Sequence, residues 1–329
     1  MAERRYIAEF GVSERVEGAF AISNTQMGRT RNDKSYLRCL ISDKSGEVSG
    51  RMWSVDEATF RRLPTEGFVW IEGETQAYQG DLQLIIQAID PIDPTPEQMR
   101  ELLPSTDKDV GVMFEEVKGL LATLKHPAAK GLANEYLADE FLMDHFRRAP
   151  AAKSMHHAYL GGLLEHTLQL LKIADVICPF YPKLNRDIVM LGLFLHDLGK
   201  TRELKFDQTF TYSDRGELIG HIVEGAIMLH DKAQQVIRTQ GVRLPSGMLT
   251  ILQHIILSHH GIPEYGAAKI PSTPEAVLVS ILDNLDAKTT IAIEAARPTR
   301  SKAVDLGGNF TDKHWALGTR MFRPDVLAE

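Results

Sequence analysis

The sequence is poor in cysteine. Its 329 residues include two, Cys39 and Cys178, which lie far apart and belong to no CxxC pair. This excludes a disulfide framework and argues against a zinc site built on cysteine, so any bound metal would be held by histidine and carboxylate side chains. The sequence also lacks an apolar run long enough to span a bilayer, and its polar first six residues lack a signal-peptide core. We therefore expect a cytoplasmic protein with no membrane partner.

Positive charge is also in deficit. Lys and Arg number 37 against 44 Asp and Glu, which gives a net charge of −7 with the 12 histidines counted as neutral. An acidic balance argues against a protein that coats nucleic acid non-specifically, but it allows a nucleic-acid substrate held in a local groove. The hydrophobic content of 43% is typical of a soluble globular protein, and the length suits two domains.

The first ninety or so residues alternate between apolar and polar side chains, which predicts β-strands. The expected strands cover residues 16–22, 36–43, 47–53, 68–77 and 82–89. Residues 54–63 predict a short helix between the third and fourth strands, with Ser54 as its N-cap and Glu57 three residues on. Five strands with a helix in that place are the order of an OB-fold barrel.

Residues 90–96 contain three prolines and mark the clearest boundary in the chain. From residue 107 apolar residues recur at helical spacing, with helices expected over residues 110–124, 128–146, 162–177, 186–196, 217–239, 246–258 and 273–296. We therefore predict a multidomain protein with an OB-fold β-barrel (1–92), a linker (93–106), an all-α domain (107–310) and a C-terminal tail (311–329) without a firm pattern.

Histidine and aspartate recur within this helical region. His196 and Asp197 are adjacent at an expected helix end, although an isolated His-Asp pair would be read as a capped or surface histidine. Further members lie in or beside apolar helices: His166, His221, His259, His260 and Asp283. Burying one such group is costly unless it is paired or bound to a metal, so several together indicate a shared cation. The set has enough ligands for two metals, with Asp197 as the natural bridge between them.

This order of residues along a run of helices resembles the HD phosphohydrolase superfamily, over roughly residues 150 to 297. The resemblance implies that one shared metal site is formed by His166, His196, Asp197 and Asp283. It also implies that His221 and the His259/His260 pair supply the second metal.

A tighter match is the segment Met-His-His-Ala-Tyr-Leu-Gly-Gly-Leu-Leu-Glu-His-Thr at residues 155–167, which resembles the YhaM family of 3′-to-5′ exoribonucleases. The order of an OB-fold followed by an HD domain is similar to that family over nearly the whole chain. Residues 43–46, Asp-Lys-Ser-Gly, and 51–53, Arg-Met-Trp, are similar to the anticodon-binding type of OB-fold. The resemblance implies stepwise, metal-dependent removal of nucleoside 5′-monophosphates from the 3′ end of single-stranded RNA, with DNA left open as a substrate.

Other residues have two interpretations each. His156 and His157 either line the substrate pocket or form a polar helix start. Lys200, three residues after Asp197, is predicted to hold a phosphate oxygen beside the metals and so to act in catalysis. Asp286 either accepts a hydrogen bond from a metal-bound histidine or is solvated.

In the barrel, basic residues cluster in and after the first hairpin: Arg29, Arg31, Lys34 and Arg38. With Tyr36 they are candidates to bind substrate, and Trp53, Trp70 and Tyr78 are further candidates for base stacking. The alternative, preferred for the tryptophans, is that the aromatic residues fill the barrel core.

Manganese is the first candidate for the metal, but the ligand types do not identify it and also suit iron, zinc, cobalt, nickel and magnesium. Two other function classes are left open: an HD phosphohydrolase of a small nucleotide with a regulatory OB domain, and a non-catalytic nucleic-acid-binding protein. Self-association into a homo-oligomer is left open as well.

Overall fold

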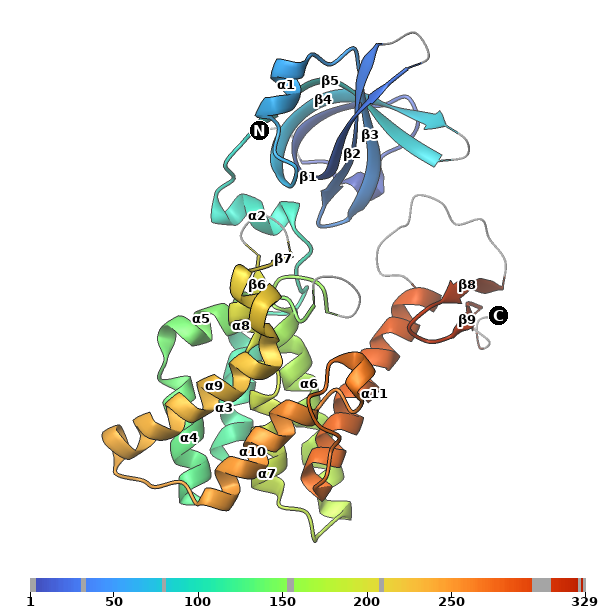
Figure 1. The fold of residues 1–329 in the computed structure, drawn as a ribbon. Coiled ribbons are helices and arrows are strands. Elements are labelled where there is room, and N and C mark those ends of the chain that lie inside the picture. The colour runs from blue at the N-terminus through green and yellow to red at the C-terminus, as the bar shows by residue number, and fades with distance from the viewer. Residues whose placement is uncertain are drawn as a thin grey trace. The chain divides into compact units, whose positions relative to one another are not determined.

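The computed structural model describes residues 4–30, 34–78, 81–152, 157–206, 210–297, 309–324 and 327 (Figure 1). The chain divides into two compact units. One is built mainly from residues 1–105 together with residues from 292 onward, and the other from residues 106–206 and 210–291.

The N-terminal unit contains a closed barrel of five strands, which confirms the predicted OB-fold. The strands are β1 (Arg15–Arg29), β2 (Ser35–Asp43), β3 (Gly46–Trp53), β4 (Gly67–Tyr78) and β5 (Asp81–Pro91). β1 pairs with β2 and β4, and β5 closes the barrel by running antiparallel to β4 and parallel to β3. Alternate side chains point inward, so that Leu37, Ile41 and Leu84 are fully buried.

The helix between β3 and β4, α1 (Glu57–Arg62), begins later than predicted. Its N-cap is Asp56, whose side chain accepts a hydrogen bond from the backbone N–H of Thr59 at 2.6 Å. Ser54 has a positive φ of 58° and lies outside the helix, so the prediction of Ser54 as N-cap is wrong. The preference for Trp53 and Trp70 in the barrel core is also wrong, since these side chains are 47% and 42% exposed.

After α2 (Pro96–Leu102), the second unit is predominantly helical. Its helices are α3 (Val110–Ala122), α4 (Pro127–Leu137), α5 (Glu140–Arg148), α6 (Gly162–Ile177), α7 (Arg186–Leu195), α8 (Lys200–Glu203), α9 (Asp214–Gln240), α10 (Ser246–Ser258) and α11 (Pro274–Ala296). The single helix predicted over residues 128–146 is therefore two, because Asp139 caps a new helix by accepting from the N–H of Leu142. Tyr136 and Phe146 both pack edge-on against Phe194 in the core.

Short elements complete the described chain. They are the 3-10 turns Ile7–Glu9, Cys178–Phe180 and Pro263–Tyr265, the strand pair β6 (Leu204–Lys205) and β7 (Thr211–Tyr212), and the hairpin β8 (Phe310–His314) and β9 (Thr319–Phe322). The hairpin falls in the segment for which the sequence pattern predicts nothing firm. Within the described ranges, no helix has the length and apolar character needed to cross a membrane.

Candidate metal centre

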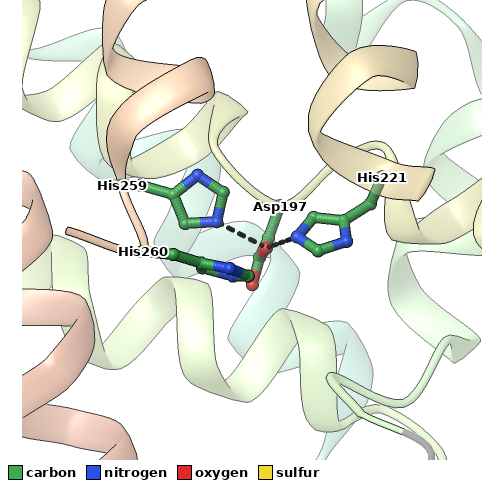
Figure 2. A group of neighbouring side chains, drawn as sticks. All are labelled: Asp197, His221, His259 and His260. Carbon is green, nitrogen blue, oxygen red and sulfur yellow. Dashed lines mark ion pairs between the residues drawn. The ribbon is translucent and has the colours of Figure 1, made fainter. Parts of the chain in front are cut away.

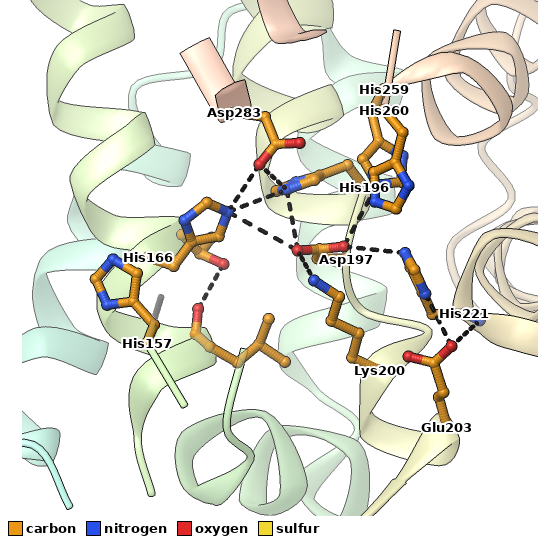
Figure 3. Close-up of polar contacts among 12 residues, drawn as sticks. His157, His166, His196, Asp197, Lys200, Glu203, His221, His259, His260 and Asp283 are labelled. Atoms are coloured by element: carbon orange, nitrogen blue, oxygen red, sulfur yellow. Dashed lines mark hydrogen bonds and ion pairs between the residues drawn. The ribbon is translucent and has the colours of Figure 1, made fainter. Parts of the chain in front are cut away.

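The ends and faces of several helices bring all the predicted ligands together (Figure 3). α6 contributes His166, the C-terminal end of α7 contributes His196 and Asp197, and α11 contributes Asp283. α9 contributes His221, and the end of α10 contributes His259 and His260. The sequence pattern therefore identified side chains that are far apart along the chain and adjacent in the fold.

One group of ligand atoms lies between α6, α7 and α11. The Nε2 atom of His166 lies 3.3 Å from Nε2 of His196 and 3.3 Å from Oδ1 of Asp283. The Oδ2 atom of Asp197 lies 3.3 Å from Nε2 of His196. Ligand atoms about 2.1 Å from a common metal at tetrahedral or octahedral angles are ~3.0–3.4 Å apart, so these separations suit one bound ion.

A second group lies on the other side of Asp197 (Figure 2). Its Oδ1 atom lies 3.5 Å from Nε2 of His221 and 3.5 Å from Nε2 of His259. With His260 included, the ligand atoms of this group all lie within 4.8 Å of one another. Asp197 thus turns one carboxylate oxygen to each group, and His259 and His260 both belong to the second one.

Hydrogen bonds fix which nitrogen each imidazole presents. The Nδ1 atoms of His196 and His259 lie 2.8 and 2.7 Å from the backbone carbonyl three residues earlier, and that of His260 lies 2.5 Å from the carbonyl of Tyr265. A carbonyl oxygen only accepts, so Nδ1 must carry the hydrogen in these rings. The neutral ring then presents the lone pair of Nε2 to the centre, which is the form that binds a metal.

In the other two histidines, His166 and His221, a carboxylate accepts the hydrogen of Nδ1. Nδ1 of His166 lies 2.6 Å from Oδ2 of Asp286, and Nδ1 of His221 lies 2.9 Å from Oε1 of Glu203. Glu203 is a functional residue that the sequence reasoning missed. Metal-bound histidines commonly donate their second ring N–H to such an acceptor.

Burial of these ligand atoms favours a bound cation. Asp197, His166, His196 and His259 are at most 2% exposed. Oδ1 of Asp197 and Nε2 of His221 and His259 have no hydrogen-bond partner among the described residues. Unpaired buried polar atoms are costly, and a divalent cation would satisfy all three at once. The residues present therefore fit a divalent metal.

The charge states differ between the two groups. Burial opposes protonation of His166, but the carboxylates of Asp283 and Asp286 raise its pKa to about 9, so a metal entering there has to displace a proton. Burial lowers the pKa of His221 and His259, and burial with the neighbouring positive charges lowers the pKa of His260 to about 4. The histidines of the second group are therefore neutral and ready to bind a metal at neutral pH.

Lys200 lies beside the bridging carboxylate. Its Nζ atom is 2.7 Å from Oδ2 of Asp197, and its side chain is 11% exposed. Burial alone would raise the pKa of Asp197, but the charge of Lys200 holds it well below its usual value. The bridging carboxylate is therefore ionised.

Asp286 is buried behind the first group, so its solvated interpretation is wrong. Besides His166, its carboxylate contacts Nε2 of His157 at 3.0 Å and the side-chain amide of Gln169 at 2.5 Å. The other ring nitrogen of His157 lies 2.7 Å from the hydroxyl of Tyr159. His157 is 4% exposed and precedes α6, so it is not a polar helix start; His156 lies outside the described residues.

Replacing Asp286 by alanine is expected to weaken metal binding about 10- to 100-fold, because His166 loses the acceptor that fixes its ring. Calorimetric titration of chelator-stripped protein with manganese measures this. Asp286→Asn keeps an acceptor oxygen and should lose less. Unchanged affinity in the alanine variant would show that His166 does not depend on this hydrogen bond.

A separate aromatic cluster lies on the outer face of the barrel. Tyr36 and Trp53 are cross-strand neighbours with ring centroids 5.6 Å apart. The guanidinium of Arg51 lies 5.3 Å from the Tyr36 ring, 5.1 Å from the Trp53 ring and 5.8 Å from the Tyr78 ring. We call Tyr36, Arg51, Trp53 and Tyr78 the barrel cluster.

The remaining predicted substrate residues of the barrel lie on or beside β1 and β2. Arg29 ends β1 and Lys34 precedes β2, while Arg31 lies outside the described residues. Arg38 lines an open groove of about 360 Å³ on this face, with Asn24, Gln26, Cys39, Leu40 and Ser49. Arg51 was not among the predicted substrate residues, although it lies in the Arg-Met-Trp segment that is similar to the anticodon-binding type of OB-fold.

The chain is similar to one known domain family and to several known proteins. The HD domain family model matches residues 163–288. The 3′-5′ exoribonuclease YhaM of Shouchella clausii (strain KSM-K16) is 31% identical over 318 residues, covering 94% of this chain and 93% of the relative. The protein of the same name from Bacillus pumilus (strain SAFR-032) is 31% identical over 331 residues, covering 98% and 99%. Among solved structures, the second OB-fold domain of replication protein A from Methanococcus maripaludis matches 28% of this chain and 96% of its own, at 14% identity and a TM-score of 0.21.

Proposed function

Because this chain belongs to the YhaM family of 3′-5′ exoribonucleases, we propose that its histidine and aspartate cluster is the active site of a metal-dependent nuclease that shortens single-stranded RNA from the 3′ end. The observation that carries the proposal is the pair of ligand groups that share Asp197, with unpartnered buried atoms aimed at one of them. A structural role alone would not require such a costly arrangement.

We assign two ions to this centre. His166, His196 and Asp283 would hold the first, His221, His259 and His260 the second, and Asp197 would bridge both. Two bound ions would activate a water and stabilise the attacking and leaving oxygens of an in-line displacement at phosphorus. Manganese is our first candidate for both positions, and the expected product is a nucleoside 5′-monophosphate.

The ammonium of Lys200 would change partner from Asp197 to the substrate. This ammonium neutralises Asp197 at 2.7 Å in the structure. Once Asp197 is neutralised by bound metal, the ammonium is available to a phosphate oxygen of the substrate. It would then offset the negative charge that develops during hydrolysis.

The barrel cluster would hold the strand that is being degraded. Trp53 and Tyr78 are 47% and 46% exposed, and Arg51 lies over their rings. Exposed aromatic faces next to a guanidinium bind single strands through stacking and phosphate contact without selecting a sequence. Such local binding is compatible with the net charge of −7.

Trp53→Ala is expected to weaken binding of single-stranded RNA by about 1–3 kcal/mol, because one stacked base loses its platform. Fluorescence anisotropy of a labelled oligonucleotide, with catalysis blocked by chelator, measures the change. Trp315→Ala is the matched control, since Trp315 is 76% exposed between β8 and β9 and is not a predicted stacking residue. An equal loss in both variants would remove the barrel cluster from substrate binding.

The direction in which RNA is shortened tests the function directly. RNA labelled at its 5′ end is incubated with the protein and manganese, and single-stranded DNA of the same length is run beside it. Products that shorten one nucleotide at a time from the labelled full length support 3′-to-5′ removal. Intact RNA with every divalent metal tried would contradict the proposal and direct attention to small nucleotides as substrates.

A further inference from the structure

The two ligand groups are supported differently. His166 and His196 are fully buried, and they lie within α6 and at the end of α7. His221 and His260 are only partly buried and stand where helical segments begin or end. Groups at such junctions open locally at lower free energy than groups in a packed core.

His221 starts a helical segment rather than continuing one. Gly220, immediately before it, has φ 74° and ψ 159°, which breaks α9 into two helical pieces. The backbone N–H of His221 is therefore at a helix N-terminus, where no carbonyl of its own helix can accept it. Without an outside acceptor, both this N–H and the ring would be loosely held.

Glu203, the last residue of α8, supplies that acceptor. Its Oε1 atom accepts the backbone N–H of His221 at 2.9 Å and the ring Nδ1–H at 2.9 Å (Figure 3). The carboxylate side chain is 11% exposed, so water competes little for these bonds. One oxygen thus fixes both the start of the helix and the orientation of the imidazole.

Close backbone packing between α8 and α9 supports this contact. A Cβ atom on Gly216 would lie 2.3 Å from the carbonyl oxygen of Glu203. The backbone N–H of Ser213 donates to the same carbonyl at 2.8 Å. α8 and the first turn of α9 are therefore held together, which fixes the position from which Glu203 reaches His221.

We propose that Glu203 is a positioning residue that presents His221 to the second metal ion, so that loss of Glu203 weakens the binding of one ion and spares the other. The proposal rests on the two-ion site proposed above. The first ion does not depend on Glu203, since its histidines are held by Asp286 and by a carbonyl of α7 itself.

Manganese titration of chelator-stripped protein separates the two positions. The wild type should bind two ions in two steps. Glu203→Ala should leave one step unchanged and weaken the other about 10- to 100-fold. Glu203→Gln should recover most of the loss, because its amide oxygen can accept both N–H groups. Glu217→Ala, an exposed acidic residue in the first turn of α9, should bind like the wild type.

Several outcomes would overturn the proposal. One is a single binding step in the wild type, and another is two unchanged steps in Glu203→Ala. A third is equal weakening of both steps in Glu203→Ala, which a purely structural role would give. RNA degradation by the wild type, measured alongside, keeps the two proposals apart. Selective weakening of one step in Glu203→Ala, with no RNA degradation by the wild type, would retain the role of Glu203 and reject the nuclease function.

Discussion

Asp197→Ala is expected to lower the rate of RNA degradation at least about a thousandfold, equivalent to ~4 kcal/mol of transition-state stabilisation. Its two oxygens face different ligand groups, Oδ2 toward His196 at 3.3 Å and Oδ1 toward His221 at 3.5 Å. Alanine therefore removes a ligand from both positions, whereas loss of any one histidine affects a single position. Single-turnover rates at saturating RNA and manganese measure the effect.

A second buried aspartate gives the matched control. Asp187, in the first turn of α7, accepts the backbone N–H groups of Lys125 and His126 at 2.8 and 2.7 Å. Asp187→Ala should lower the free energy of unfolding by about 1–3 kcal/mol and leave the rate for the folded enzyme unchanged. An Asp197→Ala enzyme that degrades RNA at a rate comparable with the wild type would remove Asp197 from the centre.

The ligand set could be predicted because each member breaks the apolar pattern of its own helix. His166 and Asp283 are polar groups within apolar segments, and burial of such groups needs a partner. Spacing alone could not divide the roles of Asp283 and Asp286, which are three residues apart on one helix face. The structure places them on opposite sides of one imidazole, with Asp283 toward Nε2 of His166 and Asp286 toward Nδ1.

Other features depend on contacts that spacing does not encode. Glu203 precedes His221 by 18 residues, and only the turn through β6 and β7 brings them together. Alternation predicted the strands of the barrel but not which face of each strand points inward, so Trp53 and Trp70 were assigned to the core. The β8–β9 hairpin is too short to leave a periodic signal.

Gly199→Ala is expected to have the second-largest effect, through backbone contact alone. A Cβ atom at this position would lie 2.0 Å from the carbonyl oxygen of His221 and 2.9 Å from the nitrogen of Gly225. α8 would have to move away from α9, which should lower the free energy of unfolding by about 1–3 kcal/mol. The same movement separates Glu203 from His221, so we expect about a hundredfold loss of activity in the molecules that remain folded.

Gly119 is the control for Gly199, because a side chain added there would meet no neighbour. It lies within α3, and a Cβ atom there would meet nothing within 4 Å. Gly119→Ala should therefore raise the free energy of unfolding by about 0.5–1 kcal/mol, because alanine is the better helix former, without changing activity. Urea denaturation and single-turnover rates of both variants make the comparison. Wild-type activity and stability in Gly199→Ala would mean that α8 and α9 can separate without displacing His221. The close approach of their backbones would then not be needed to position His221 for the second metal.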